Sequence, residues 1–197
     1  MRITRRLSLL AVATVAVAAS ACGSDNPISP DARAKPTPQP SATLLSTPAT
    51  VRTLQRTTAL AAPIRVSKSI GVLGGTISVP GAGLTVVVPP LAVSRSMTIT
   101  VTALAGSAVA YESEPAGTKF LLPLVVTQDF TNTKTSGLNL SLFKGGYFKS
   151  ATDIDPNTGT AKVSELLNLS ITLAPLAGVF TVTHFSGYLV ATGCEDQ

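Results

Sequence analysis

The sequence predicts an all-β protein, a single antiparallel β-sandwich that follows an N-terminal signal peptide and a disordered tether. Between about residues 64 and 193, short runs rich in β-branched and apolar residues alternate with turn residues. Such runs suit half-buried strands. No segment in this part shows a long apolar repeat of 3.6 residues with capping residues at its ends. Many short strands without helices are typical of a sandwich.

The chain length fits one domain with additional segments rather than two domains. It has 197 residues, of which 45% are apolar and 13% are charged, and it contains no tryptophan. This composition suits a β-rich module outside the cytoplasm.

The N-terminus predicts export. Three arginines (Arg2, Arg5 and Arg6) precede an uninterrupted small and apolar run from Leu7 to Ala19. A charged segment followed by an apolar run of this length is typical of a signal peptide and is too short for a stable membrane anchor. We therefore assign residues 1–21 to a signal peptide.

The residues around the cleavage position resemble a bacterial lipoprotein signal. Cys22 follows the small residue Ala21 and precedes Gly23. The resemblance implies that Cys22 is lipidated and becomes the new N-terminus, although Ala19 stands where that pattern most often has leucine. The residue after Cys22 is not the aspartate of inner-membrane retention, which implies the outer membrane. The alternative is ordinary cleavage after Ala21 and a secreted protein.

The chain has two cysteines. A lipidated Cys22 would leave Cys194 unpaired, and no disulfide framework would then support the fold. If Cys22 keeps its thiol, a Cys22–Cys194 bond is the alternative in an oxidising compartment.

Residues 22–63 are rich in Pro, Ser, Thr and Ala and predict a disordered tether. Such a composition buries too little apolar surface to offset its ordering entropy. The basic excess also lies before residue 70, because residues 22–69 hold six Lys/Arg against two Asp/Glu, whereas residues 70–197 hold six against eight. Nucleic-acid binding, which needs a clustered basic face, is therefore excluded from the expected partners.

The predicted sandwich spans residues 64–193, and residues 194–197 form a tail. Clean alternation in residues 96–104 places Met97, Ile99 and Val101 on one face and threonines on the other. The predicted strands are residues 74–80, 84–88, 96–104, 120–127, 137–143, 146–150, 160–163, 168–173 and 179–190.

Four motifs, in order, resemble the ZU-five domain family of zona-occludens proteins, netrin receptors and ankyrins. A glycine pair precedes a strand that ends in Pro89-Pro90, a proline and a glycine lead into a later strand, and a His-Phe-Ser step lies near the end. The segments are Gly74–Thr76, Gly83–Ala92, Glu114–Pro123 and Thr183–Tyr188. The resemblance implies a β-sandwich that serves interaction or structure.

In ZU-five-containing death-domain scaffolds, the tripeptide His-Phe-Ser marks a self-cleaving peptide bond, and this chain has the same tripeptide at His184-Phe185-Ser186. The resemblance implies Ser186 as the nucleophile, His184 as the base and Phe185 as the source of the scissile carbonyl, provided that the fold strains the bond. The alternative is structural: in one extended strand, His184 and Ser186 share a face with Phe180 and Val182. We expect the bond to stay intact, so no catalytic residue is favoured.

Asp153, Asp155 and Asn157 are weak calcium candidates, because alternate oxygen ligands suit that ion. The segment lacks the glycine and glutamate positions of an EF-hand loop, and Asp155–Gly159 predicts a hairpin turn by itself. With one histidine, the chain supports neither a zinc site nor a Ser-His-Asp triad.

Together these observations predict a non-enzymatic surface or periplasmic lipoprotein with a ZU-five-like module. Its expected partners are the membrane, through lipidated Cys22, and an unknown protein, with no cofactor and no small-molecule substrate. One alternative is a domain that cleaves itself between Phe185 and Ser186. A second is a carbohydrate-binding sandwich, which an aromatic content of 5% disfavours.

Overall fold

The computed structural model describes residues 42–194. These residues form antiparallel sheets, and their helical elements are three-residue 3-10 turns, so the all-β prediction is confirmed. The strands are β1 (Ala42–Thr53), β2 (Gln55–Leu60), β3 (Ile64–Ile70), β4 (Gly75–Val79), β5 (Leu84–Val88), β6 (Met97–Ala103), β7 (Gly106–Ala108), β8 (Ala110–Glu114), β9 (Lys119–Asp129), β10 (Lys144–Phe148), β11 (Ile154–Asp155), β12 (Thr160–Asn168), β13 (Ser170–Leu173), β14 (Leu176–His184) and β15 (Gly187–Cys194).

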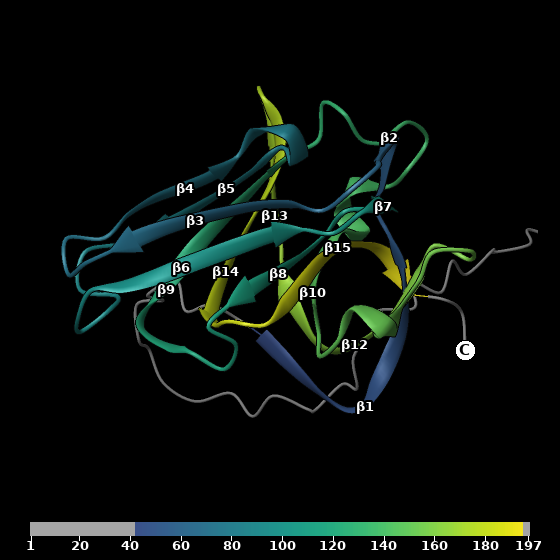
Figure 1. The fold of residues 1–197 in the computed structure, drawn as a ribbon. Coiled ribbons are helices and arrows are strands. Elements are labelled where there is room, and N and C mark those ends of the chain that lie inside the picture. The colour runs from purple at the N-terminus through teal and green to yellow at the C-terminus, as the bar shows by residue number, and fades with distance from the viewer. Residues whose placement is uncertain (1–41, 195–197) are drawn as a thin grey trace, which may run out of the picture.

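Two sheets form the layers of the sandwich (Figure 1). The larger sheet has the order β1-β12-β10-β15-β8-β6-β3, with β11 paired to β12, and the smaller one has the order β13-β14-β9-β5-β4. Strands β2 and β7 form a separate two-stranded ribbon. The last strand, β15, therefore lies inside the larger sheet, between β10 and β8.

The core lies between the two sheets because alternate residues of their strands face inward. In β6, Ile99 and Val101 are buried as predicted, and in the opposite sheet Val86 pairs with Val126 in register. Phe185 is buried in the same core.

The predicted tether is wrong for residues 42–60, which form β1 and β2. Val51 is fully buried and pairs with Ala161 of β12 and with Cys194 of β15. Leu54 is also fully buried in the core. This segment has no periodicity of its own. The partners of β1 lie more than 100 residues later in the chain, and β2 pairs with β7. The signal peptide and residues 22–41 lie outside the described residues.

Two other predicted strands need correction. Residues 137–143 form a loop with the 3-10 turn η2 (Leu140–Leu142), because the Asn139 side chain accepts a hydrogen bond from the Ser141 N–H and caps that turn. The predicted strand 179–190 is two strands, β14 and β15, which belong to different sheets.

Candidate functional site

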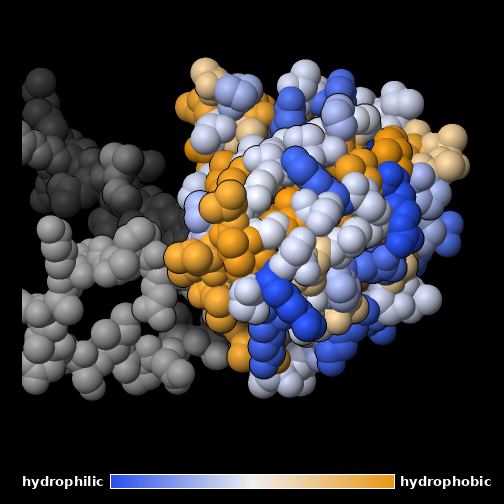
Figure 2. Space-filling model, turned by 60° about the vertical axis from the view of Figure 1, so that its left-hand side comes forward, coloured by the Kyte–Doolittle hydropathy of each residue, from blue (hydrophilic) through white to orange (hydrophobic). Residues whose placement is uncertain are grey.

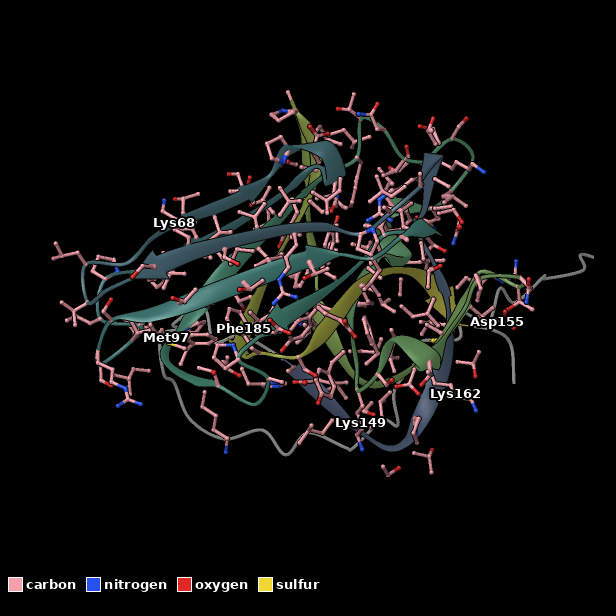
Figure 3. All side chains as sticks on the ribbon, viewed as in Figure 1. Lys68, Met97, Lys149, Asp155, Lys162 and Phe185 are labelled. Carbon is pink, nitrogen blue, oxygen red and sulfur yellow. The ribbon has the colours of Figure 1, made fainter. Side chains whose placement is uncertain are left out.

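The His184-Phe185-Ser186 step is the crossover between the two sheets. β14 ends at His184 in the smaller sheet, and β15 begins at Gly187 in the larger one. Phe185 is buried, and its ring packs edge-on against Phe120 with 4.6 Å between the ring centroids. Figure 3 shows Phe185 among the strands of the sandwich. The prediction that His184 and Ser186 lie on one face of a single strand is therefore wrong.

Backbone hydrogen bonds hold both sides of the Phe185–Ser186 bond. The Phe185 N–H donates to the Thr118 carbonyl and the Gly117 N–H donates to the Phe185 carbonyl, each at 2.8 Å. The Ser113 N–H donates to the Ser186 carbonyl at 3.0 Å. Neither Phe185 nor Ser186 has a positive φ. This step has the contacts of an ordered sheet crossover.

His184 is bound to groups other than Ser186. Its Nε2 lies 3.2 Å from Glu165 Oε2, and its Nδ1 lies 3.2 Å from the Tyr188 hydroxyl. That hydroxyl donates to the His184 carbonyl at 2.7 Å. The Ser186 hydroxyl contacts the Phe148 carbonyl instead, at 3.5 Å. A general base must reach the proton that it removes, and this arrangement does not bring the predicted base to the predicted nucleophile.

Tyr147, Glu165, His184 and Tyr188 form a group that we call the histidine cluster. The Tyr147 ring packs edge-on against His184, with 5.0 Å between centroids. Burial raises the pKa of Tyr188 well above its ordinary value, and the Glu165 charge and Tyr147 raise it further, so this phenol stays protonated as a donor. The cluster joins β14 of one sheet to β10, β12 and β15 of the other.

Sequence reasoning missed Glu165 and Tyr147. Glu165 is 6% exposed and lies in β12 among buried apolar neighbours. A lone carboxylate in an apolar strand signals a buried partner, because a buried charge needs compensation. The only histidine was the available partner, although the sequence did not show the pairing of the strands.

A second polar group, also missed, lies inside the core around Arg56. Arg56 is 5% exposed; its Nη1 donates to the Ala108 carbonyl, while Nε and Nη2 have no hydrogen-bond partner. The Tyr111 hydroxyl donates to the Ala82 carbonyl at 3.0 Å and to the Gln128 side chain. Burial raises the pKa of Tyr111 to about 12, although the Arg56 charge opposes that shift. Within residues 42–194, Arg56 has no carboxylate partner.

The carboxylates of the weak calcium candidates are used in turns. Asp153 accepts hydrogen bonds from the Lys149 and Ser150 N–H groups, and Asp155 accepts one from the Asn157 N–H at 2.8 Å. This last bond lowers the pKa of Asp155. Asp155 lies near the outer end of the β11–β12 turn (Figure 3). Among the described residues, no three His, Cys, Asp or Glu side chains are grouped to hold a metal.

Cys194 at the end of β15 is disulfide-bonded, so it is not the unpaired cysteine that a lipidated Cys22 would leave. The chain has one other cysteine, Cys22, which lies outside the described residues. A lipid on a cysteine sulfur is attached as a thioether and leaves no thiol. Within one chain, a lipid on Cys22 and a Cys22–Cys194 disulfide therefore exclude each other.

Neither the family models nor the curated proteins include a match to this chain. No part of the chain between residues 42 and 194 folds into a helix with the length and apolarity to cross a membrane. The resemblance to the ZU-five family therefore rests on the motifs in the sequence.

Proposed function

We propose that this protein is a non-enzymatic extracytoplasmic module, a ZU-five-like β-sandwich that serves protein interaction or envelope structure. The observation that carries the proposal is the position of His184. It bridges the two sheets through Glu165 and Tyr188, and it lies at the crossover that the sandwich needs to place β15. The residues most suggestive of chemistry thus have a structural role.

Exposed apolar side chains at one end of the sandwich support a protein partner. Leu73 is 84% exposed in the β3–β4 turn, and Leu91 and Leu121 are also largely exposed. Leu91 donates its N–H to the Val72 carbonyl, and Leu121 donates to the Ala92 carbonyl, so these segments are adjacent. Figure 2 shows apolar side chains gathered on one side of the molecule. Such patches on soluble domains mark interaction sites.

Leu91 adds a second argument for this end. It is the one non-glycine residue in the described part of the chain with a positive φ, 66°. A left-handed leucine costs about 1 kcal/mol or more. The surrounding fold holds an apolar side chain outward at this cost, which is expected where the side chain contacts a partner.

Export is supported by the signal sequence and by the Cys194 disulfide, since structural disulfides persist in oxidising compartments. Attachment depends on Cys22. Lipidation would anchor the protein to the envelope, most simply to the outer membrane. The Cys194 disulfide favours the alternative, in which cleavage after Ala21 leaves the Cys22 thiol free to pair with Cys194.

The two alternative functions receive less support. Self-cleavage between Phe185 and Ser186 lacks a base near the serine hydroxyl. Carbohydrate-binding sandwiches use exposed aromatic rings, and the exposed large apolar side chains of residues 42–194 include no Phe or Tyr.

Fractionation of bacterial cells that express the full chain, with labelling by a radioactive fatty acid, tests the proposal. We expect the protein outside the cytoplasm. Label that is lost in Cys22→Ser shows the lipid anchor, whereas an unlabelled protein whose Cys22→Ser variant gains a free thiol at Cys194 shows the disulfide. Retention of the unprocessed chain in the cytoplasm would contradict the proposal.

A further inference from the structure

Two neighbouring hollows lie beside the β11–β12 turn. The larger one, of about 490 Å³, lies between the end of β1, the loop after β9, the β11–β12 turn and the end of β15. The smaller one, of about 270 Å³, lies between β7 and the same turn. Both are lined by Gln55, Pro156 and Gly159, so they are adjacent.

The larger hollow is cationic. Of the residues from 42 to 194, Arg52 and Lys134 are the only charged ones that line it, and their side chains make no ion pair within that range. Among residues 42–194, no carboxylate lines the hollow. The Asp155 carboxylate nearby accepts the Asn157 N–H of its own turn. Two unpaired cations facing one space favour an anionic group there.

The floor of this hollow is held by hydrogen bonds. The Thr53 N–H and hydroxyl both donate to the Gly159 carbonyl at 2.9 Å. The Gln55 side chain donates to the Thr53 hydroxyl, and the Lys134 N–H donates to the Gln55 carbonyl at 2.8 Å. The backbone that carries both cations is thus fixed before any ligand arrives, which lowers the ordering cost of binding.

The smaller hollow is mainly apolar. Leu104, Ala105, Ala108 and Ile154 line it, and none of its lining residues in the described part of the chain is charged. The alanines leave space that larger side chains would fill. This hollow suits a short apolar group, because binding there removes the apolar surface of the group from water.

We propose that the two hollows form one site for a small amphipathic anion. Arg52 and Lys134 bind its carboxylate or phosphate head, and its short apolar tail lies past Gln55 and Pro156 against Leu104 and Ile154. The site is independent of the exposed apolar end that supports the interaction role.

Calorimetric titration of the purified full chain at low ionic strength tests this site, with octanoate as the probe. Octyl phosphate in place of octanoate distinguishes the two head groups, and saturable binding of either supports the site. Acetate and inorganic phosphate lack the tail, and octanol lacks the head. We expect each of these three to bind at least tenfold more weakly, because each loses the contacts of one hollow.

The variants separate the two halves. Arg52→Gln with Lys134→Gln removes the head contacts and is expected to weaken octanoate binding by roughly tenfold or more. Ala105→Phe, at an exposed position, fills the apolar hollow and is expected to weaken octanoate binding but leave phosphate binding unchanged. Lys68→Gln with Arg95→Gln is the matched charge control, and Figure 3 shows Lys68 at the end of the molecule away from Asp155.

Three results would overturn the proposal. The first is the absence of saturable binding for both amphiphiles. The second is octanol or acetate binding as tightly as octanoate. The third is an equal loss of octanoate binding in the control double variant and in the Arg52→Gln, Lys134→Gln double variant, when the unfolding midpoints of both match that of the parent chain.

Discussion

At the scale of single residues, the buried polar groups carry the most specific consequences. Tyr111 is buried, and its pKa of about 12 lies above the ordinary value of 10.0. Between these two values the unfolded chain loses the phenol proton while the folded chain keeps it. The free energy of unfolding therefore falls as the pH rises through this window, by roughly 2–3 kcal/mol from Tyr111 alone.

Tyr111→Phe is expected to flatten the loss of stability between pH 10 and pH 12, because phenylalanine has no proton to release. Tyr188 also has a raised pKa and keeps its own contribution in the variant. Urea unfolding at pH 9, 10, 11 and 12 measures the effect. Parallel losses in the parent chain and the variant would contradict the burial of a protonated Tyr111.

Arg56 is a buried cation without an ion-pair partner in the described structure. Its compensation comes from the Ala108 carbonyl and from the Tyr111 ring, whose centroid lies 5.8 Å from Arg56 Cζ. Replacing buried charged groups with apolar side chains of similar volume is often neutral or stabilising, because the cost of burying the charge is removed. We expect Arg56→Met to leave the free energy of unfolding unchanged or raise it by about 1 kcal/mol. Arg56→Ala, which also opens a cavity, should lower it by about 2 kcal/mol or more. A loss of more than about 2 kcal/mol in Arg56→Met would show that the charge itself stabilises the fold.

At the scale of elements, the start of β15 requires a glycine at position 187, because a larger residue would not fit there. A Cβ at Gly187 would lie 2.2 Å from the Phe148 ring, whereas a Cβ at Gly71 would meet no atom within 4 Å, and the φ of Gly71 is not positive. Gly187→Ala should lower the free energy of unfolding by about 2–3 kcal/mol, and Gly71→Ala should leave it nearly unchanged. Denaturant midpoints of both variants check this, and equal midpoints would contradict the close packing of β15 on Phe148.

β1 is part of the fold, although its composition predicted a tether. It pairs with β12 and β15 and buries Val51. A chain that begins at residue 42 should unfold cooperatively, and a chain that begins at residue 64 should lack that transition, because a row of hydrogen bonds and the core contact of Leu54 are lost. Circular dichroism during heating compares the two. Equal thermal transitions in the two chains would show that residues 42–63 do not stabilise the fold, as the tether prediction implied.

The strands that sequence reasoning located have local signals. β5 ends before Pro89, and β6 alternates, with Ile99 and Val101 of the predicted face buried and Met97 of that face partly buried. β1 has no such signal, because its stability comes from partners distant in the chain. The histidine cluster could not be predicted from the sequence for the same reason. Glu165 and His184 meet only because β12 and β14 lie in opposite sheets that pack together. The break at Phe185–Ser186 depends on the sheet change and not on a local turn residue.

At the scale of the whole molecule, the crossover determines what a cut would do. β15 lies between β10 and β8, and Leu189 and Val190 are buried. A chain cut between Phe185 and Ser186 would keep this strand in place by sheet hydrogen bonds and core contacts. Native size and solubility would therefore not reveal the cut. The fragments must be separated under denaturing and reducing conditions, because Cys194 of the C-terminal fragment is disulfide-bonded.

The most direct test of the non-enzymatic account is therefore the intact mass of the purified chain, incubated for a prolonged time at neutral pH and then measured in denaturant with a reductant that opens the Cys194 disulfide. We predict one species that retains Ser186–Gln197, with Ser186→Ala differing only by the mass of one oxygen atom. A time-dependent split into two fragments at Phe185–Ser186 that Ser186→Ala abolishes would contradict the account.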